Sequence, residues 1–333
     1  MPEPVRVAVV GVGDFGRHHV RLYRALDGVE LVGVFDTNRE RAHAVAKEFE
    51  TRALASLEAV VQAATAVSLA VPTRDHARLG VELLRRGCDL LVEKPMAASL
   101  AEADELVRTA EETKRILQVG HTERFNPAVR AAAQVVTEPL FFEVHRLGVF
   151  SGRSLDVDVI FDVMIHDLDI LLSFVPAPVE HVHAVGIPIL SPKVDIASVR
   201  LEFANGCVAN LTASRVSTEK VRKLRFFQPH AYVSIDYSRQ DVLVVDLDKA
   251  AAPSAPPAGL PAGIKMRKLE TVREEPLQGE LRAFVEAVCT RQPGPVTGQE
   301  GRQALALAER VAGGIAEHAR KLPASLAVTR VES

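Results

Sequence analysis

The first 120 residues alternate short β-branched runs with helical stretches, and this alternation restricts the fold more than any other feature. Alternation of this kind is typical of βαβ units, which form a parallel sheet covered by helices on both faces. The predicted strands are Val5–Val10, Val29–Phe35, Ala66–Val71, Asp89–Val92 and Ile116–Val119. The predicted helices between them are Phe15–Leu26, Arg39–Phe49, Asp75–Arg86 and Ala101–Lys114.

The pattern changes after Pro139, where strand-like segments follow one another with few helices. This texture predicts an α+β domain with an open, mainly antiparallel sheet, and Asn205-Gly206 predicts a hairpin turn within it. The Pro/Ala/Gly-rich segment 250–263 is expected to be a solvated loop of that sheet, with a lid as the alternative. The expected strands are 140–149, 181–189, 196–204, 207–216, 222–227, 231–237 and 241–247, and the expected helices are 127–136, 157–174, 277–290 and 299–319.

Length and composition set broad limits on function. A chain of 333 residues is expected to form two domains, 1–121 and 122–333, with the C-terminal helices able to pack back on the first. The net charge of −3 and the absence of Trp argue against a nucleic-acid partner. The three cysteines lie far apart, which suits a reducing compartment and offers no metal-binding spacing. No signal segment or membrane span is evident, so we expect a cytoplasmic protein.

A glycine-rich loop opens the chain: Gly11, Gly13 and Gly16 have G-x-G-x-x-G spacing between a strand and a helix. In such loops the first glycine permits a tight turn, the second lets the backbone approach a pyrophosphate, and the third lets the helix pack closely. Asp36 ends the next strand and is placed to bind a ribose hydroxyl. These features predict a Rossmann domain that binds NAD, because the charge of Asp36 disfavours a 2′-phosphate. NADP remains the alternative cofactor, because two nearby basic residues could reach its phosphate: Arg39 and Arg41.

The predicted helix at 157–174 carries a narrow polar band opposite an apolar side. Asp162 and His166 are four residues apart on this band and hence in contact range. A carboxylate beside an imidazole fixes its tautomer and raises its basicity, as a general base requires. A solvent-facing side of the helix and a divalent metal site are the alternatives; we expect no metal, because no second His or Cys falls at ligand spacing on that side.

A lysine stands where the fourth predicted strand ends, in the sequence Glu93-Lys94-Pro95. Together with the glycine loop and Asp162-x-x-x-His166, this triplet makes the chain resemble the Gfo/Idh/MocA family of oxidoreductases over nearly its full length. The resemblance implies a catalytic group of Lys94, Asp162 and His166, with a nicotinamide between a Rossmann domain and a sheet domain. Many members have Gly where this chain has Met164, a difference that is expected to narrow the pocket. The expected cofactor contacts are Gly11, Gly13, Asp14, Phe15, Gly16, Asp36, Ala70, Pro72, His76, Glu93 and Lys94.

The substrate is suggested by shorter stretches, "ERFNPAVR" and "ASRVS" among them. They look most like the branch of the family that oxidises the 3-hydroxyl of UDP-N-acetylglucosamine, whose ketone is then aminated for lipid A. The resemblance thus implies a nucleotide-sugar substrate and a downstream aminotransferase as a partner. The open sheet of the second domain favours a face-to-face homodimer or homotetramer. A myo-inositol or free-sugar dehydrogenase and a non-enzymatic NAD-binding regulator are the alternatives. Four residues are predicted to contact the substrate: Arg124, Asn126, Arg153 and Arg215.

Overall fold

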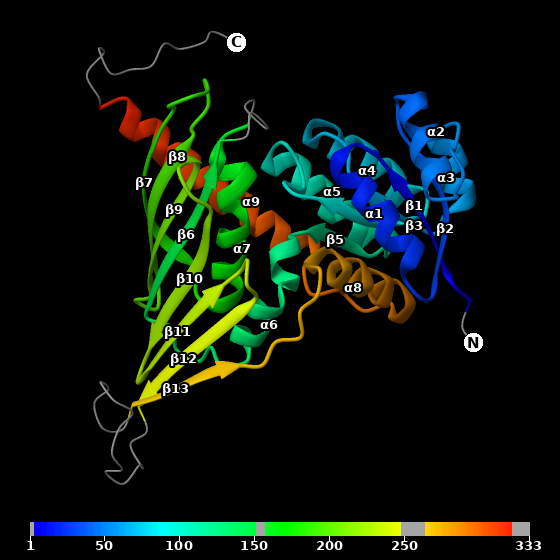
Figure 1. Ribbon diagram of the computed structural model, residues 1–333. Coiled ribbons are helices and arrows are strands. Elements are labelled where there is room, and N and C mark those ends of the chain that lie inside the picture. Colours follow the sequence, from blue (N-terminus) through cyan, green and yellow to red (C-terminus); the bar gives the residue numbers. More distant parts are fainter. Residues whose placement is uncertain (1–2, 151–156, 248–263, 322–333) are drawn as a thin grey trace. The chain divides into compact units, whose positions relative to one another are not determined.

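The computed structural model describes residues 3–150, 157–247 and 264–321, and Figure 1 shows their helices and strands. The chain divides into two compact units. The first unit comprises residues 1–125 and 275–305, and the second comprises residues 126–274 and 306–333. Residues 275–305 thus group with the N-terminal segment, although the sequence boundary was expected at 121. Arg153 and the segment 250–263, for which we predicted a substrate contact and a loop, lie outside the described residues.

The first unit contains a five-stranded parallel sheet in the order β2-β1-β3-β4-β5. The strands are β1 (Val5–Val10), β2 (Val29–Phe35), β3 (Ala66–Leu69), β4 (Asp89–Glu93) and β5 (Leu117–Gly120). Between β1 and β3 the strand order reverses, and in such open sheets ligands bind outside the carboxyl ends of the strands at this reversal. The predicted α/β Rossmann domain is confirmed.

Helices cover this sheet, and most of them follow the predicted bounds closely. The short helix α3 was not predicted, because seven residues carry little periodicity; its N-cap is Ser56, whose side chain accepts from the Ala59 N–H. The helices of the first unit are α1 (Asp14–Ala25), α2 (Arg39–Glu48), α3 (Leu57–Ala63), α4 (His76–Arg85), α5 (Leu100–Thr113), α8 (Pro276–Thr290) and the beginning of α9 (Gly298–Ala319).

The second unit is built on an eight-stranded sheet in the order β13-β12-β11-β10-β6-β9-β8-β7. Only β6 and β9 pair in parallel among these neighbours, so the predicted mainly antiparallel sheet is confirmed, as is the hairpin at Asn205-Gly206 between β8 and β9. The strand β13 was missed because half of its residues are charged. The strands are β6 (Phe141–Val149), β7 (Val179–Ile187), β8 (Ile196–Phe203), β9 (Val208–Ser217), β10 (Val221–Gln228), β11 (Ala231–Asp236), β12 (Asp241–Leu247) and β13 (Ile264–Leu269).

One face of this sheet forms the core of the second unit, where α7 (Ile165–Phe174) packs on β6 and β10. The rings of Phe142, Phe174 and Phe226 lie with their centroids 5.5 to 6.5 Å apart. Such a cluster buries a large apolar area at few positions, so it fixes α7 against the sheet. The other helices of this unit are α6 (Pro127–Ala133) and the remainder of α9.

Candidate active site

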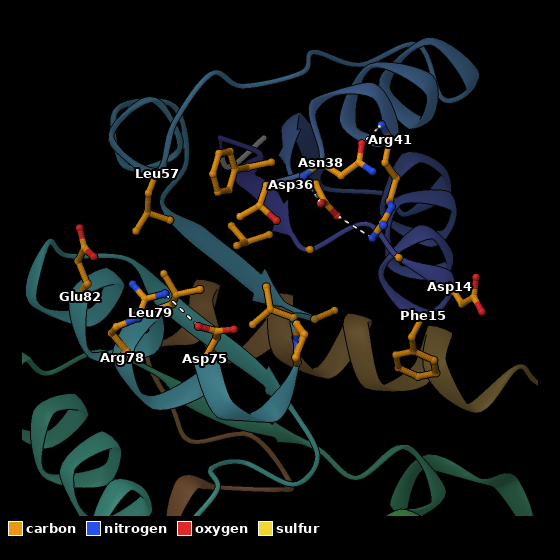
Figure 2. A pocket seen from close by; sticks show the side chains of 18 residues that line it. Asp14, Phe15, Asp36, Asn38, Arg41, Leu57, Asp75, Arg78, Leu79 and Glu82 are labelled. Carbon is orange, nitrogen blue, oxygen red and sulfur yellow. Dashed lines mark hydrogen bonds and ion pairs between the residues drawn. The ribbon is translucent and has the colours of Figure 1, made fainter. Parts of the chain in front are cut away.

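A cavity of about 680 Å³ opens at the carboxyl ends of β1, β2 and β3 in the first unit. Figure 2 shows Asp36, Asn38 and Arg41 gathered on one side of it, while Asp75 comes from the turn that leads into α4 and Arg78 from α4 itself. The predicted cofactor residues that line the cavity are Gly11, Gly13, Asp14, Phe15, Asp36, Ala70 and Pro72. Gly16, His76, Glu93 and Lys94 do not line it.

The glycine loop has the geometry that its spacing predicts. Gly11 has φ of +84°, and a Cβ there would lie 2.6 Å from the Ala70 carbonyl oxygen. A Cβ on Gly16 would overlap the carbonyl oxygen of Gly11, so both positions require glycine. Gly13 is different, since the nearest atom to a Cβ there is an Arg41 side-chain nitrogen at 3.7 Å. The space beside Gly13, which is the N-cap of α1, fits a phosphate at a helix N-terminus.

Asp36 links this loop to the end of β2. Its Oδ2 accepts the Val12 N–H at 3.0 Å, and its Oδ1 accepts the Asn38 N–H at 2.8 Å. A guanidinium nitrogen of Arg41 lies 3.5 Å from Oδ2. The carboxylate is only 8% exposed, so it presents a fixed acceptor to the cavity, where a ribose hydroxyl would bind.

His76 lies under the cavity wall and is 1% exposed. Its Nε2 is 2.8 Å from the Val71 carbonyl oxygen and its Nδ1 is 2.9 Å from that of Pro95. Burial lowers the pKa of His76, although the two carbonyls raise it. The side chain therefore connects the loop after β3, which lines the cavity, to the segment that contains Lys94.

Lys94 is partly exposed at the carboxyl end of β4, and a cis peptide bond joins it to Pro95. The next strand, β5, ends at Gly120 and is followed by His121, which is 1% exposed. Burial, together with the charges of Arg124 and Lys94, lowers the pKa of His121 to about 3. His121 is therefore a neutral imidazole within the electrostatic range of Lys94. Our sequence analysis missed it, although its position after a strand end was a usable signal.

In the second unit, a single π-helical turn at Ile160–Met164 leads into α7. The turn contains Asp162, and His166 lies in the first turn of α7; both are partly exposed. Single π turns often occur at functional sites. The grouping of these two residues with Lys94 of the first unit stays a prediction.

Two buried ion pairs hold this segment. Asp167, next to His166, accepts two hydrogen bonds from Arg146 at 2.6 and 2.8 Å and one from the Tyr237 hydroxyl at 3.0 Å. Further upstream, Arg215 donates to the Val157 carbonyl at 2.6 Å and to Asp195 at 2.7 Å. Both ends of the segment that carries Asp162 and His166 are therefore attached to the sheet.

Three of the predicted substrate residues have partners within their own units. Arg124 donates to Glu300 at 2.6 Å and to the Pro295 carbonyl at 3.0 Å. Asn126 is the N-cap of α6 and donates to the Tyr237 carbonyl at 3.1 Å. Arg215 is 8% exposed and held as described above. These contacts give each side chain a role in fixing the fold, and contact with a substrate remains a prediction.

The structure adds cavity residues to those that the sequence predicted as NAD contacts. Arg41, which the sequence offered as a contact for the phosphate of NADP, lines the cavity. Asn38 follows Asp36 closely and its side chain caps α2, so its position after Asp36 was an available signal. No such signal marked the α4 residues that line the cavity, because helical periodicity does not show whether a helix faces a ligand. The further lining residues are Val10, Phe35, Thr37, Asn38, Arg41, Leu57, Val71, Asp75, Arg78, Leu79 and Glu82.

Two further features of the described residues concern metal binding and membrane crossing. In residues 3–150, 157–247 and 264–321, no group of three or more His, Cys, Asp or Glu is placed to hold a metal ion. None of the helices in this part of the chain has the length and apolar content that crossing a bilayer requires.

Comparison with known proteins gives matches to both units. Residues 5–121 match the family described as Gfo/Idh/MocA oxidoreductases with an NAD-binding Rossmann fold, and residues 148–231 match the Gfo/Idh/MocA C-terminal domain. The chain is 36% identical over 308 residues to the UDP-N-acetylglucosamine 3-dehydrogenase of Acidithiobacillus ferrooxidans, covering 92% of this chain and 96% of that protein. A crystal form of that enzyme superimposes with a TM-score of 0.86 and 35% identity, covering 93% and 97% of the two chains. The scyllo-inositol 2-dehydrogenase (NAD⁺) of Bacillus subtilis is 28% identical over 243 residues, covering 65% of this chain and 69% of the enzyme.

Proposed function

The chain belongs to the Gfo/Idh/MocA family of NAD-dependent oxidoreductases, and we propose that it oxidises the 3-hydroxyl of UDP-N-acetylglucosamine to a ketone. The observation that carries the proposal is the 36% identity with a UDP-N-acetylglucosamine 3-dehydrogenase across nearly the whole of both chains. The inositol dehydrogenase described above is less similar and matches about two thirds of this chain.

The cavity of the first unit fits the cofactor. The open space at Gly13 would accommodate the pyrophosphate at the N-terminus of α1, and Asp36 would accept a hydrogen bond from the adenosine ribose. Phe15 and Pro72 line the same cavity and would contact the cofactor. NAD, when bound, supplies the hydride acceptor.

The proposed chemistry assigns one step to each catalytic side chain. His166 takes the proton of the sugar hydroxyl as the carbon–oxygen double bond forms and the carbon loses its hydride. Asp162 orients the imidazole and stabilises its charged form. Lys94 stabilises the negative charge that develops on the oxygen. The location of Lys94 at the end of a parallel strand, and of His166 just after a π turn, supports these roles.

The proposal places the protein in a pathway that needs a second enzyme. A 3-keto sugar nucleotide is the substrate of a glutamate-dependent aminotransferase, and the resulting 3-amino sugar would supply lipid A. The reaction would take place in the cytoplasm, a reducing compartment that suits three free cysteines, of which Cys88 and Cys207 are buried.

We also propose that the protein is a homo-oligomer that associates through the second face of the eight-stranded sheet. On this face a row of apolar side chains crosses neighbouring strands in register, and the Phe141, Phe227 and Tyr232 rings lie 5.0 to 5.7 Å apart within it. Phe227 is 37% exposed and Met266 is 53% exposed. A two-fold axis would place this row against its own copy. The row consists of Val208, Phe141, Phe227, Tyr232, Val245 and Met266.

The particle mass in solution tests this association. Phe227→Glu would place a charge in the row, so light scattering should give a smaller particle for this variant than for the unmodified protein.

A coupled assay tests the proposed reaction. Alcohol oxidation by NAD is unfavourable near neutral pH, so the assay adds a 3-keto-sugar aminotransferase with glutamate and follows the 3-amino product by mass spectrometry. We expect this product from UDP-N-acetylglucosamine, formed at least about 10²-fold more slowly with the His166→Ala protein. No product, together with brisk NAD reduction by myo-inositol or a free hexose, would reject the nucleotide-sugar proposal and retain a dehydrogenase.

A further inference from the structure

A row of four buried polar side chains lies behind the cavity of the first unit. Tyr23 and His19 come from α1, Ser68 comes from β3, and Glu93 comes from β4. His19 and Ser68 are fully buried, Tyr23 is 1% exposed and Glu93 is 8% exposed. Burying a polar group lowers the stability of the fold unless the group is hydrogen-bonded. Four buried polar side chains from two strands and a helix therefore suggest a functional role.

The four side chains form a continuous series of close polar contacts, of which the first two are hydrogen bonds and the last is a contact between His19 and the Glu93 carboxylate. The Tyr23 hydroxyl lies 3.1 Å from Ser68 Oγ, and Ser68 Oγ lies 3.0 Å from His19 Nδ1. His19 Nε2 then lies 3.0 Å from Glu93 Oε1. Every link is within ordinary hydrogen-bond distance.

The chemistry of the four groups determines which member of each contact donates a hydrogen and which accepts it. A carboxylate only accepts hydrogen bonds, and a neutral imidazole has one N–H and one acceptor nitrogen. In the neutral form of the ring this assigns the N–H to Nε2, facing Glu93, and lets Nδ1 accept the hydroxyl hydrogen of Ser68. Burial raises the pKa of Tyr23, so its phenol stays protonated and donates to Ser68. Each donor in the chain then has one acceptor.

The Glu93 carboxylate is also confined from the other side. A Cβ on Gly120 would lie 2.8 Å from the carboxyl carbon and both oxygens of Glu93. Glu93 and Gly120 pair across β4 and β5, and the residue after Glu93 is Lys94. The carboxylate thus occupies a space bounded by His19 and Gly120, directly before the predicted catalytic lysine.

We propose that His19 is a positioning residue for the dehydrogenase reaction: by holding the Glu93 carboxylate, it fixes the end of β4 from which Lys94 extends. The inference rests on the proposed role of Lys94. The His19 ring also lies 5.3 Å from the ring of Phe15, which lines the cavity.

The central experiment compares two substitutions of His19. His19→Leu removes the polar contact with Glu93, and we expect the turnover number to fall by about 10²-fold, the loss that a 1 Å displacement of a reacting group produces. His19→Gln keeps an N–H near the position of Nε2 and restores most of the turnover. The KM for the sugar and the Kd for NAD stay close to those of the unmodified protein in both variants. His18→Leu, an adjacent exposed position on the same helix, is the matched control and stays fully active.

A second pair of measurements separates positioning from folding. Gly120→Ala leaves His19 intact but displaces the Glu93 carboxylate, so it should lower the turnover number while NAD still binds. ¹⁵N NMR of the His19 ring in the unmodified protein should show the Nε2–H tautomer, and this readout needs no substrate. Turnover is measured with whichever sugar the protein oxidises. If the protein oxidises no sugar, the proposed function fails, while the tautomer of His19 still tests the contacts between the four buried side chains. Full activity of His19→Leu, equal losses in the Leu and Gln variants, or an Nδ1–H tautomer would each overturn the proposal.

Discussion

The cofactor cavity of the first unit and the π turn of the second unit present their functional groups in different ways. Around the cavity, the backbone positions the functional groups: glycines leave space for a ligand, and two backbone N–H groups hold the Asp36 carboxylate. At the π turn, Asp162 and His166 are held indirectly, through Arg146–Asp167 on one side and Arg215–Asp195 on the other. One site depends on glycines and backbone N–H groups, whereas the other depends on buried ion pairs between side chains.

This difference predicts different consequences of substitution. Changes at the cavity should alter which cofactor binds and how tightly. Changes at the π turn should alter turnover when they remove Asp162 or His166, and stability when they remove an ion pair. The five predictions below test this division, beginning with the largest expected effect.

The largest effect is expected for the proposed base. His166→Ala should lower the turnover number by about two to four orders of magnitude, the range for a positioned acid–base group. NAD affinity should not change, because the cavity lies in the other unit. Steady-state kinetics and calorimetric NAD titration measure the two quantities, and Ser173→Ala, an exposed position on the same helix, is the control. Near-normal turnover would remove His166 from the mechanism.

Lys94→Met tests the contribution of the first unit to chemistry. Loss of a group that stabilises developing charge should lower the turnover number by about 10²- to 10³-fold and should raise the KM for the sugar much less. Initial rates over a range of sugar concentrations separate the two effects. A variant that only binds the sugar more weakly would make Lys94 a binding residue.

Arg146→Met tests the indirect support of the π turn. It leaves the Asp167 carboxylate buried without its guanidinium, and breaking a buried pair in this way costs about 3–5 kcal/mol of unfolding free energy. Arg267→Met is the matched control, because the exposed pair with Asp246 should contribute about 1 kcal/mol or less. Urea unfolding compares the two proteins. Similar losses in both would show that the buried pair does not support the segment.

The same contrast explains what the sequence could predict. The bounds of β1 and β2 and the hairpin at Asn205-Gly206 were predicted correctly, because local patterning and turn chemistry determine them. The partners of Arg124 and Arg215 were not predictable, since Glu300 is 176 residues from Arg124 and Asp195 is 20 residues from Arg215. A basic residue looks the same in sequence whether it holds a phosphate or a buried carboxylate. The π turn was likewise read as ordinary α-helix, because one inserted residue hardly changes the apolar pattern.

Asp36→Ser returns to the cavity and should change cofactor choice. The unmodified protein should use NAD well ahead of NADP, and the substitution should narrow this preference about fivefold or more, because two like charges at 4 Å repel by roughly 1 kcal/mol even in water. Arg41, 3.5 Å from Asp36, would then be able to bind a 2′-phosphate. The measurement is kcat/KM for each cofactor. Equal use of both by the unmodified protein would contradict the role of Asp36.

The smallest effect concerns stability in mild acid, where the two units should again differ. The pKa of His121, lowered to about 3 by burial, lies below the ordinary histidine value of about 6.5. The unfolded chain therefore binds a proton near pH 6.5 that the folded chain does not, so stability is present above pH 6.5 and is lost as the pH falls toward 3. From pH 7.5 to 6.0 this loss amounts to about 0.8 kcal/mol. His76, whose pKa is also lowered, acts in the same direction.

In the second unit, backbone and side-chain donors, Arg215 among them, lower the pKa of Asp195 despite its burial. A carboxyl group of this kind gives stability above an unfolded pKa of about 3.9, and that stability is lost only as the pH falls through the lower folded value. Asp195 is therefore silent between pH 7.5 and 6.0, and mild acid acts on the histidines of the first unit. Urea unfolding at the two pH values should show a difference about 0.8 kcal/mol smaller for His121→Gln than for the unmodified protein. Asp195→Asn should lower stability equally at both. An unchanged pH difference in His121→Gln would mean that this histidine takes up a proton in the folded protein.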